Sequence, residues 1–166
     1  MKWMYGPILR AHGAGGMIAI NSLGKSRCLF SFCRDGSEKC MSAFYTIDKE
    51  RRLVLSSGDG VLTKEDLWGH MERLSKDPDF NPDFCQVLDF TQITALEVEP
   101  EDVRQLAQRN IFSPRSRRAF VVKDDLQFGL ARMFEIHREL KGETGIRVFR
   151  TFDEAMDWIL IGKAAS

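Results

Sequence analysis

The sequence lacks any long hydrophobic run. No stretch approaches the roughly 18 consecutive apolar residues that a membrane-spanning helix needs. The first residues, MKWMYGPILRAHGAGG, also lack the continuous apolar segment of a secretory signal. These absences argue against a membrane protein and against a secreted one, so we expect a cytoplasmic protein with no membrane span.

Cysteine is scarce too, with four residues in 166. Cys28, Cys33, Cys40 and Cys85 are unevenly spaced and do not form the pattern of a disulfide framework. The first three have no fourth ligand at the spacing of a zinc finger, so we expect no bound metal. Cys85 lies in an apolar run and is predicted to be a small core residue, not a nucleophile.

Net charge is absent as well, since 24 basic residues balance 24 acidic ones. Residues 1–40 carry six basic and two acidic side chains, and the remainder is correspondingly acidic. This asymmetry is too mild to predict a nucleic-acid partner.

Residues 1–40 also lack hydrophobic periodicity, because glycine and serine interrupt every apolar cluster. We expect a poorly ordered extension there, and the run that begins at Met41 resembles a normal start, so the extension could reflect a misassigned start. The folded domain is predicted to span residues 41–163.

From Met41 onward, apolar runs of strand length alternate with amphipathic runs of helical length. The charged turn between the first two strands predicts a hairpin, and Ser-Gly-Asp-Gly after the second is expected to end the sheet. Helices are predicted after Thr63, which forms a capping pattern with Asp66, after Pro100, after Asp124 or Asp125, and after Thr151, which pairs with Glu154. The expected strands are 44–47, 53–57, 84–90, 119–122 and 146–149.

The resulting order, β-β-α-β-α-β-α-β-α, predicts an α/β fold with a mostly parallel sheet. The third helix is expected to bury an apolar stripe, with His137 hydrogen-bonded at the edge of the core. That stripe consists of Leu126, Leu130, Met133, Phe134, His137 and Leu140. Residues 113–118, which include Arg115, Arg117 and Arg118, are predicted to form a solvated loop, or an anion site.

This element order, the strand VLDF and the loop TQITALEVEP resemble the STAS domain of anti-sigma factor antagonists, the SpoIIAA-like fold. The resemblance covers about residues 43–161. FGLARMFE and the F-x-E-A-x-x-W-I helix are similar to small, uncharacterised SpoIIAA-like proteins of bacteria. The same architecture is shared with the lipid-binding half of SEC14-like domains.

In the family pattern, a strand ending in aspartate leads to an aspartate and two serines at a helix start, and a kinase phosphorylates one serine. Aligned on the strand end, Asp89 matches the first aspartate and Glu97 the second, while Val98 and Glu99 replace the serines. The resemblance therefore implies a module without the phosphoacceptor, in which Glu99 supplies a fixed negative charge. Alternatively, these acids only complement the helix dipole.

Two threonines near this turn, Thr91 and Thr94, are expected to shape it by local hydrogen bonds, although phosphorylation of either is an open alternative. The family resemblance implies a non-enzymatic module that docks on a regulatory protein. The candidate interaction surface is Asp89, Thr91, Glu97, Val98, Glu99 and Asp102.

The alternative function is a carrier of a small molecule or lipid, as the SEC14 similarity implies. Its apolar pocket would lie between helix and sheet and be lined by Phe128, Met133, Phe134, Phe149, Phe152 and Trp158. No nucleophile and base can be paired from the sequence, so we expect neither an enzyme nor a cofactor. The edge of the first hairpin would permit dimerisation, but the sequence predicts no oligomeric state.

Overall fold

The computed structural model describes residues 42–164, and the predicted extension over residues 1–40 lies outside them. The predicted order of elements is confirmed. The chain runs β1 (Ala43–Asp48), β2 (Leu53–Thr63), α1 (Lys64–Ser75), β3 (Cys85–Glu97), α2 (Pro100–Gln108), β4 (Arg118–Val121), α3 (Asp125–Glu139), β5 (Ile146–Phe149) and α4 (Phe152–Ala164). Among these helices, none is long and apolar enough to cross a membrane.

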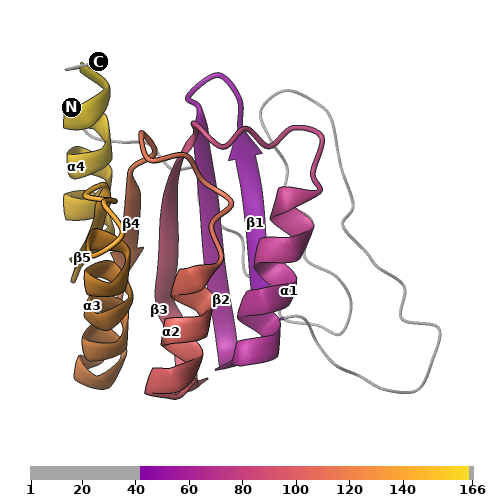
Figure 1. Cartoon of the computed structure of the whole chain (residues 1–166), viewed down its shortest axis with the longest axis vertical. Coiled ribbons are helices and arrows are strands. Elements are labelled where there is room, and N and C mark those ends of the chain that lie inside the picture. The colour runs from indigo at the N-terminus through magenta and orange to yellow at the C-terminus, as the bar shows by residue number, and fades with distance from the viewer. Residues whose placement is uncertain (1–41, 165–166) are drawn as a thin grey trace, which may run out of the picture. The chain divides into compact units, whose positions relative to one another are not determined.

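The five strands form one sheet in the order β1-β2-β3-β4-β5. β1 and β2 pair antiparallel, as the hairpin predicts, and every other pair is parallel. Helices α1, α2 and α3 lie on one face of the sheet and α4 lies on the other (Figure 1). We call these the three-helix face and the α4 face.

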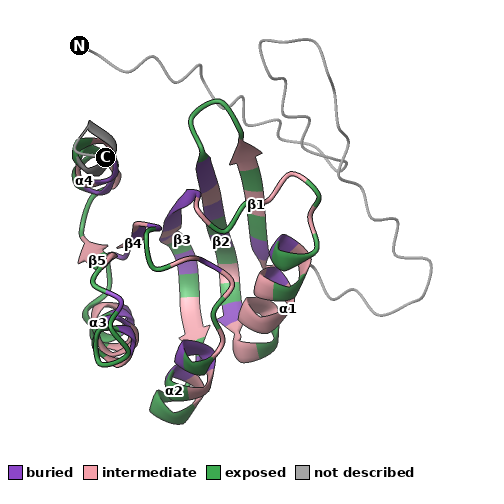
Figure 2. Cartoon of the chain, turned by 45° about the horizontal axis from the view of Figure 1, so that its top comes forward, coloured by how far each residue is buried: buried purple, intermediate pink, exposed green. Residues whose placement is uncertain are grey.

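Alternate residues of each strand divide the core between the two faces. On the α4 face, Cys85 and Val87 pack against Ala155 and Ile159, which confirms that Cys85 is a core residue. On the three-helix face, Leu88 and Phe90 pack with Val122 and Phe128. The purple, buried parts of the helices accordingly turn toward the sheet (Figure 2).

The predicted helix starts are also confirmed. The Thr63 hydroxyl accepts a hydrogen bond from the Asp66 N–H at 3.3 Å, and the Asp66 carboxylate accepts one from the Thr63 N–H at 3.0 Å. Asp124 caps α3 through the N–H groups of Leu126 and Gln127. The Thr151 hydroxyl accepts from the Glu154 N–H at 3.3 Å, at the start of α4.

The prediction that the sheet ends at Ser57 is wrong, because β2 continues to Thr63 and β3 continues to Glu97. The pairing of β2 with β3 shifts register between Ser57 and Asp59 and again after Gly60. The glycines therefore serve β-bulges and do not break the strand. A Cβ on Gly58 would lie 2.8 Å from Ile93 Cγ2, so this position needs glycine for close packing against β3.

The predicted stripe of α3 is wrong at both ends, since Leu126 is 68% exposed and Leu140 is 79% exposed. The buried residues of α3 are instead Gln127, Ala131, Glu135 and Arg138. The prediction of a solvated loop through residue 118 is wrong as well, because Arg118 is a buried residue at the start of β4. The three-helix face therefore holds more polar groups than hydrophobic periodicity indicates.

Candidate functional site

The acidic turn before α2 connects the end of β3 to the start of the helix. The Asp102 carboxylate accepts a hydrogen bond from the Glu99 N–H at 3.1 Å and pairs with Lys64 at 2.7 Å. The Lys64 ammonium, followed by the Glu99 N–H, lowers the pKa of Asp102. Glu97 and Glu99 are exposed, whereas Val98 is 8% exposed and packs with Val103 and Leu106.

Asp89 and Thr91 lie far from that turn. Asp89 pairs in register with Ser57 and Val121 in the middle of β3, where its carboxylate accepts from the Thr91 N–H at 2.9 Å. The rise of a strand places Glu97 about 26 Å further along β3. The six residues of the candidate interaction surface therefore fall into two groups, and their role in docking stays a prediction.

An apolar pocket lies on the three-helix face, between the sheet and helices α1, α2 and α3. Its volume is about 100 Å³. Each of these helices and strands β3 and β4 contribute to the lining. The apolar lining includes Met71, Leu88, Phe90, Val98, Leu106, Val122, Leu130 and Phe134.

Four polar residues also line the pocket, namely His70, Gln86, Arg118 and Gln127. Each is buried. Ligand sites in proteins combine an apolar wall with a few polar groups that orient the ligand, which is the composition found here.

His70 from α1 is held by a hydrogen-bonded chain from the sheet. The Gln86 amide donates to the Ser56 hydroxyl at 2.8 Å, and that oxygen lies 3.2 Å from His70 Nε2. Tyr45 packs against the imidazole with ring centroids 5.5 Å apart. Burial, and secondarily the positive charge of Arg73, lowers the pKa of His70 to about 4, so the imidazole is neutral at pH 7.

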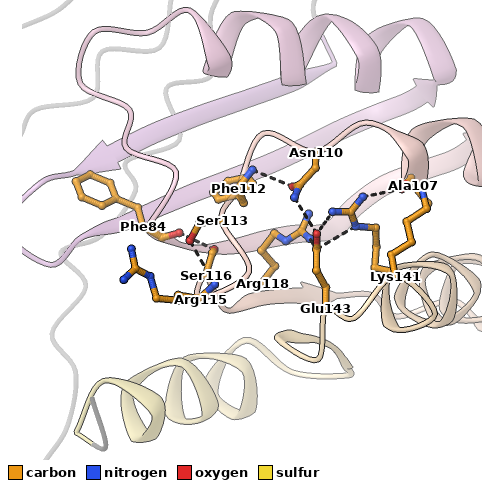
Figure 3. Close-up of polar contacts among 11 residues, drawn as sticks. Phe84, Ala107, Asn110, Phe112, Ser113, Arg115, Ser116, Arg118, Lys141 and Glu143 are labelled. Atoms are coloured by element: carbon orange, nitrogen blue, oxygen red, sulfur yellow. Dashed lines mark hydrogen bonds and ion pairs between the residues drawn. The ribbon is translucent and has the colours of Figure 1, made fainter.

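Arg118 belongs to a buried ion cluster next to the pocket, with Glu143 at its centre (Figure 3). The Glu143 carboxylate accepts from Arg118 Nη2 at 2.5 Å, from Asn110 Nδ2 at 2.8 Å and from Arg138 Nε at 3.0 Å. A second Arg138 nitrogen, Nη2, also donates to it, and Arg138 Nη1 donates to the Ala107 carbonyl at 2.7 Å.

The charge of Arg118 persists in this setting. Burial lowers the pKa of Arg118 to about 10, opposed by Glu143, so the guanidinium stays protonated at pH 7. The guanidinium carbon also lies 5.4 Å from the ring centre of Phe112 and 5.9 Å from that of Phe134. Aromatic rings at these distances stabilise a cation that is removed from water.

Four buried side-chain atoms within residues 42–164 have no hydrogen-bond partner, namely His70 Nδ1, Arg118 Nε, Gln127 Oε1 and Glu135 Oε2. The first three belong to residues that line the pocket. Leaving a buried polar atom unpaired costs about 1–3 kcal/mol, and native proteins contain few such atoms. Three of the four unpaired atoms therefore belong to the lining of one apolar pocket.

The aromatic pocket predicted from the sequence is only partly correct. Of its six residues, Phe134 lines the pocket that the structure shows. Phe149, Phe152 and Trp158 pack on the α4 face instead, so the sheet separates them from it. His137 is half-buried and is not among the lining residues.

Of the polar residues of the pocket, Arg118 alone belonged to a predicted site, the anion-site alternative for residues 113–118, and Arg115 and Arg117 of that segment do not line the pocket. Gln86 interrupts the apolar run CQVLDF, and His70 follows the apolar pair Leu67 and Trp68 by a helical turn. A polar residue at a position expected to face the core is the signal that could have identified them. Arg118 and Gln127 gave no such signal, because one lies in a charged segment and the other beside a helix cap.

The chain is similar in structure to a protein of known structure. No protein-family model and no curated protein matches the chain. The structure is similar to that of an uncharacterised DUF3478 family protein from Shewanella loihica, with 19% identity and a TM-score of 0.49 over 74% of this chain and 98% of that one. That protein is described as having a SpoIIAA-like fold.

Proposed function

We propose that this protein binds a small, largely apolar molecule in the pocket on its three-helix face. The observation that supports this proposal is the coincidence of an apolar lining with unpaired atoms on His70, Arg118 and Gln127. A pocket that served only as a packing defect would be lined by apolar groups, because buried polar atoms without partners destabilise the fold.

The pocket volume limits the size of the ligand. A buried apolar cavity of about 150 Å³ accommodates benzene. The present pocket, of about 100 Å³, is smaller, so it suits at most a molecule of about one ring or a short branched chain. The acyl chains of a phospholipid are too large for it, so the carrier alternative narrows from lipids to small molecules.

We propose that binding is not followed by catalysis. Ser56 Oγ and His70 Nε2 lie 3.2 Å apart, within reach of a nucleophile and its base. A base with a pKa of about 4 is too weak to activate a hydroxyl near neutral pH. Ser56, moreover, is buried in the sheet and is not among the described residues that line the pocket.

The experiment that tests the proposal uses toluene as a neutral probe of ring size. Methyl NMR spectra of the full chain should show saturable shifts at Leu88, Val98, Val122 and Leu130, which line the pocket. Ala131→Leu places extra carbon atoms in the pocket and should abolish these shifts. Gly129→Leu adds a side chain to the same helix where no atom lies within 4 Å of the new Cβ, so the shifts should persist.

An unsaturable response to toluene, or equal shifts in wild type and Ala131→Leu, would refute the pocket as a binding site. Native mass spectrometry of the protein isolated from cells provides a second readout. A retained small molecule that is absent from Ala131→Leu supports the proposal.

We keep a second candidate, docking on a regulatory protein, because Glu97, Glu99 and Glu101 are exposed at the start of α2. Reversing the charge in Glu99→Lys should release a partner that is captured with the native protein. Glu139→Lys, at an exposed position on α3, is the matched control and should leave capture unchanged. Equal capture by both variants would exclude the acidic turn as the docking site.

A further inference from the structure

We infer that the ligand of this pocket is a small carboxylate, a monoanion whose apolar part is about the size of one ring. This inference rests on the proposed function and adds the chemical class of the ligand. It follows from the hydrogen-bonding capacity of the ion cluster, from its net charge, and from the donor that His70 presents.

The Glu143 carboxylate has no capacity left to satisfy Arg118 fully. Its Oε1 atom accepts from Asn110 and Arg138, and its Oε2 atom accepts from Arg118 and Arg138. A carboxylate offers about four acceptor positions, and these four bonds occupy them. Arg118 Nε is therefore a buried, charged donor that needs an acceptor from outside the cluster.

The buried ion cluster also has an unbalanced charge. Arg118 and Arg138 contribute two positive charges, whereas Glu143 contributes one negative charge. An uncompensated charge in the interior is costly, and an anion at Arg118 would neutralise it. Arg138 cannot be the site of that anion, because Nε and Nη2 donate to Glu143 and Nη1 donates to the Ala107 carbonyl.

His70, which lines the pocket, carries a second unpaired donor. The Ser56 oxygen accepts a hydrogen bond from the Gln86 amide. Among the described contacts of Ser56, the acceptor for its hydroxyl hydrogen is then His70 Nε2. The neutral imidazole then carries its proton on Nδ1, which has no partner. Gln127 adds an amide whose oxygen and nitrogen exchange places by a half turn of its last torsion.

A carboxylate matches this set better than a phosphate does. Among the described residues, Arg118 and His70 each offer the pocket one unpaired donor, which matches the two oxygens of a carboxylate. A phosphate group carries three strong acceptor oxygens and nearly two negative charges, so two donors would leave it incompletely paired. Burying the second charge in an apolar pocket would cost more than these donors return. The buried ion cluster has a net charge of one positive unit, and a ligand with one negative charge would neutralise it.

The test compares probes of similar shape on the full chain. Benzoate carries the charge, benzamide is its neutral polar counterpart, and toluene reports on the pocket alone. Wild type should bind benzoate about tenfold or more tightly than benzamide, as expected for a charge-assisted hydrogen bond. Arg118→Met should lose this preference and still bind toluene, because Glu143 keeps its bonds to Arg138 and Asn110.

Arg117→Met is the matched control, since Arg117 donates to the Trp158 carbonyl of α4 and stacks on the Trp158 ring. It should retain the preference for benzoate. Equal affinities of wild type for benzoate and benzamide, with toluene bound, would overturn the carboxylate inference and leave the pocket intact. Failure of wild type to bind any of the three probes would instead refute the proposed function. The wild-type comparison decides the matter even if Arg118→Met does not fold.

Discussion

Arg118 and Glu143 join the first residue of β4 to the loop that follows α3, through a buried hydrogen bond of 2.5 Å. Arg138 on α3 donates hydrogen bonds to the same carboxylate from two of its nitrogens. Its third nitrogen donates to the Ala107 carbonyl at the C-terminal end of α2. One carboxylate thus fixes three elements around the pocket. The rigidity of the polar wall depends on it, because removing Glu143 would leave two guanidinium groups buried without a counter-ion.

We predict that Glu143→Gln lowers the free energy of unfolding by about 3 kcal/mol or more, the cost of breaking a buried ion pair on one side. Urea unfolding followed by circular dichroism measures this change. Glu139→Gln, at an exposed position on α3, is the control and should change stability by less than about 0.5 kcal/mol. Equal stability of Glu143→Gln and wild type would show that the cluster contributes nothing net.

We predict that His70 makes the fold less stable in mild acid. Its pKa is about 4 in the folded protein, whereas an imidazole exposed to water has a pKa of 6.5. Its contribution to stability is therefore complete above pH 6.5. As the pH falls from 6.5 to 4, the unfolded chain binds a proton that the folded chain excludes, so up to about 3 kcal/mol is lost.

Urea midpoints measured between pH 7.5 and 4 test this pH dependence. His70→Gln cannot titrate and should show a shallower decline than wild type over that range. His137→Gln, at a half-buried position outside the pocket lining, should keep the wild-type decline. Parallel curves for wild type and His70→Gln would contradict the assignment.

Alanine substitutions at two glycines outside the pocket lining are predicted to change the stability of the fold in opposite directions. A Cβ on Gly145 would lie 2.4 Å from the Ser116 carbonyl oxygen, so Gly145→Ala must push the backbone of two segments apart. A Cβ on Gly129, within α3, meets nothing within 4 Å. Gly145→Ala should lower the thermal midpoint, and Gly129→Ala should raise the stability by about 1 kcal/mol through helix propensity. Calorimetry of both variants decides, and a stabilised Gly145→Ala would show that the close approach is not rigid.

The order of elements and the helix starts could be predicted from the sequence because their causes are local. Thr63 and Asp66 lie one helical turn apart, and Pro100 fits the first turn of α2 without losing a hydrogen bond. The lengths of β2 and β3 could not be predicted in the same way. Gly58 and Gly60 are indicators of a turn in isolation, and only the neighbouring strand turns them into bulges.

The polar side of the pocket could not be predicted for a different reason. Periodicity detects apolar faces, whereas the buried face of α3 includes Gln127, Glu135 and Arg138. Arg138 is stable there only because Glu143 and the end of α2 meet it in space. A partner brought by tertiary structure leaves no local signal. The carrier alternative, considered from the sequence on fold similarity and aromatic content, therefore rests on different residues in the structure.

Val98 aligns with one of the two serines of the family pattern that the chain resembles, and its burial leads to the last prediction. The side chain lines the pocket and packs with Val103 and Leu106. Val98→Ser should therefore destabilise the fold by about 1–3 kcal/mol, because it removes buried carbon and buries a hydroxyl. Glu99→Ser is the matched control: Glu99 is exposed at the cap of α2, where serine is favourable, so stability should change little.

Val98→Ser and Glu99→Ser also test whether a serine at each position can be phosphorylated in the folded protein. A kinase needs the acceptor hydroxyl at the surface, so incubation with a promiscuous serine kinase should modify Glu99→Ser and leave Val98→Ser unmodified. Intact mass spectrometry reads both outcomes, with unfolding of Val98→Ser checked by circular dichroism. Phosphorylation of a folded Val98→Ser would mean that β3 and α2 separate enough to expose position 98, and the wall of the pocket would then be mobile at this point. If Val98→Ser stays unmodified, position 98 stays closed to the kinase, as the burial of Val98 predicts.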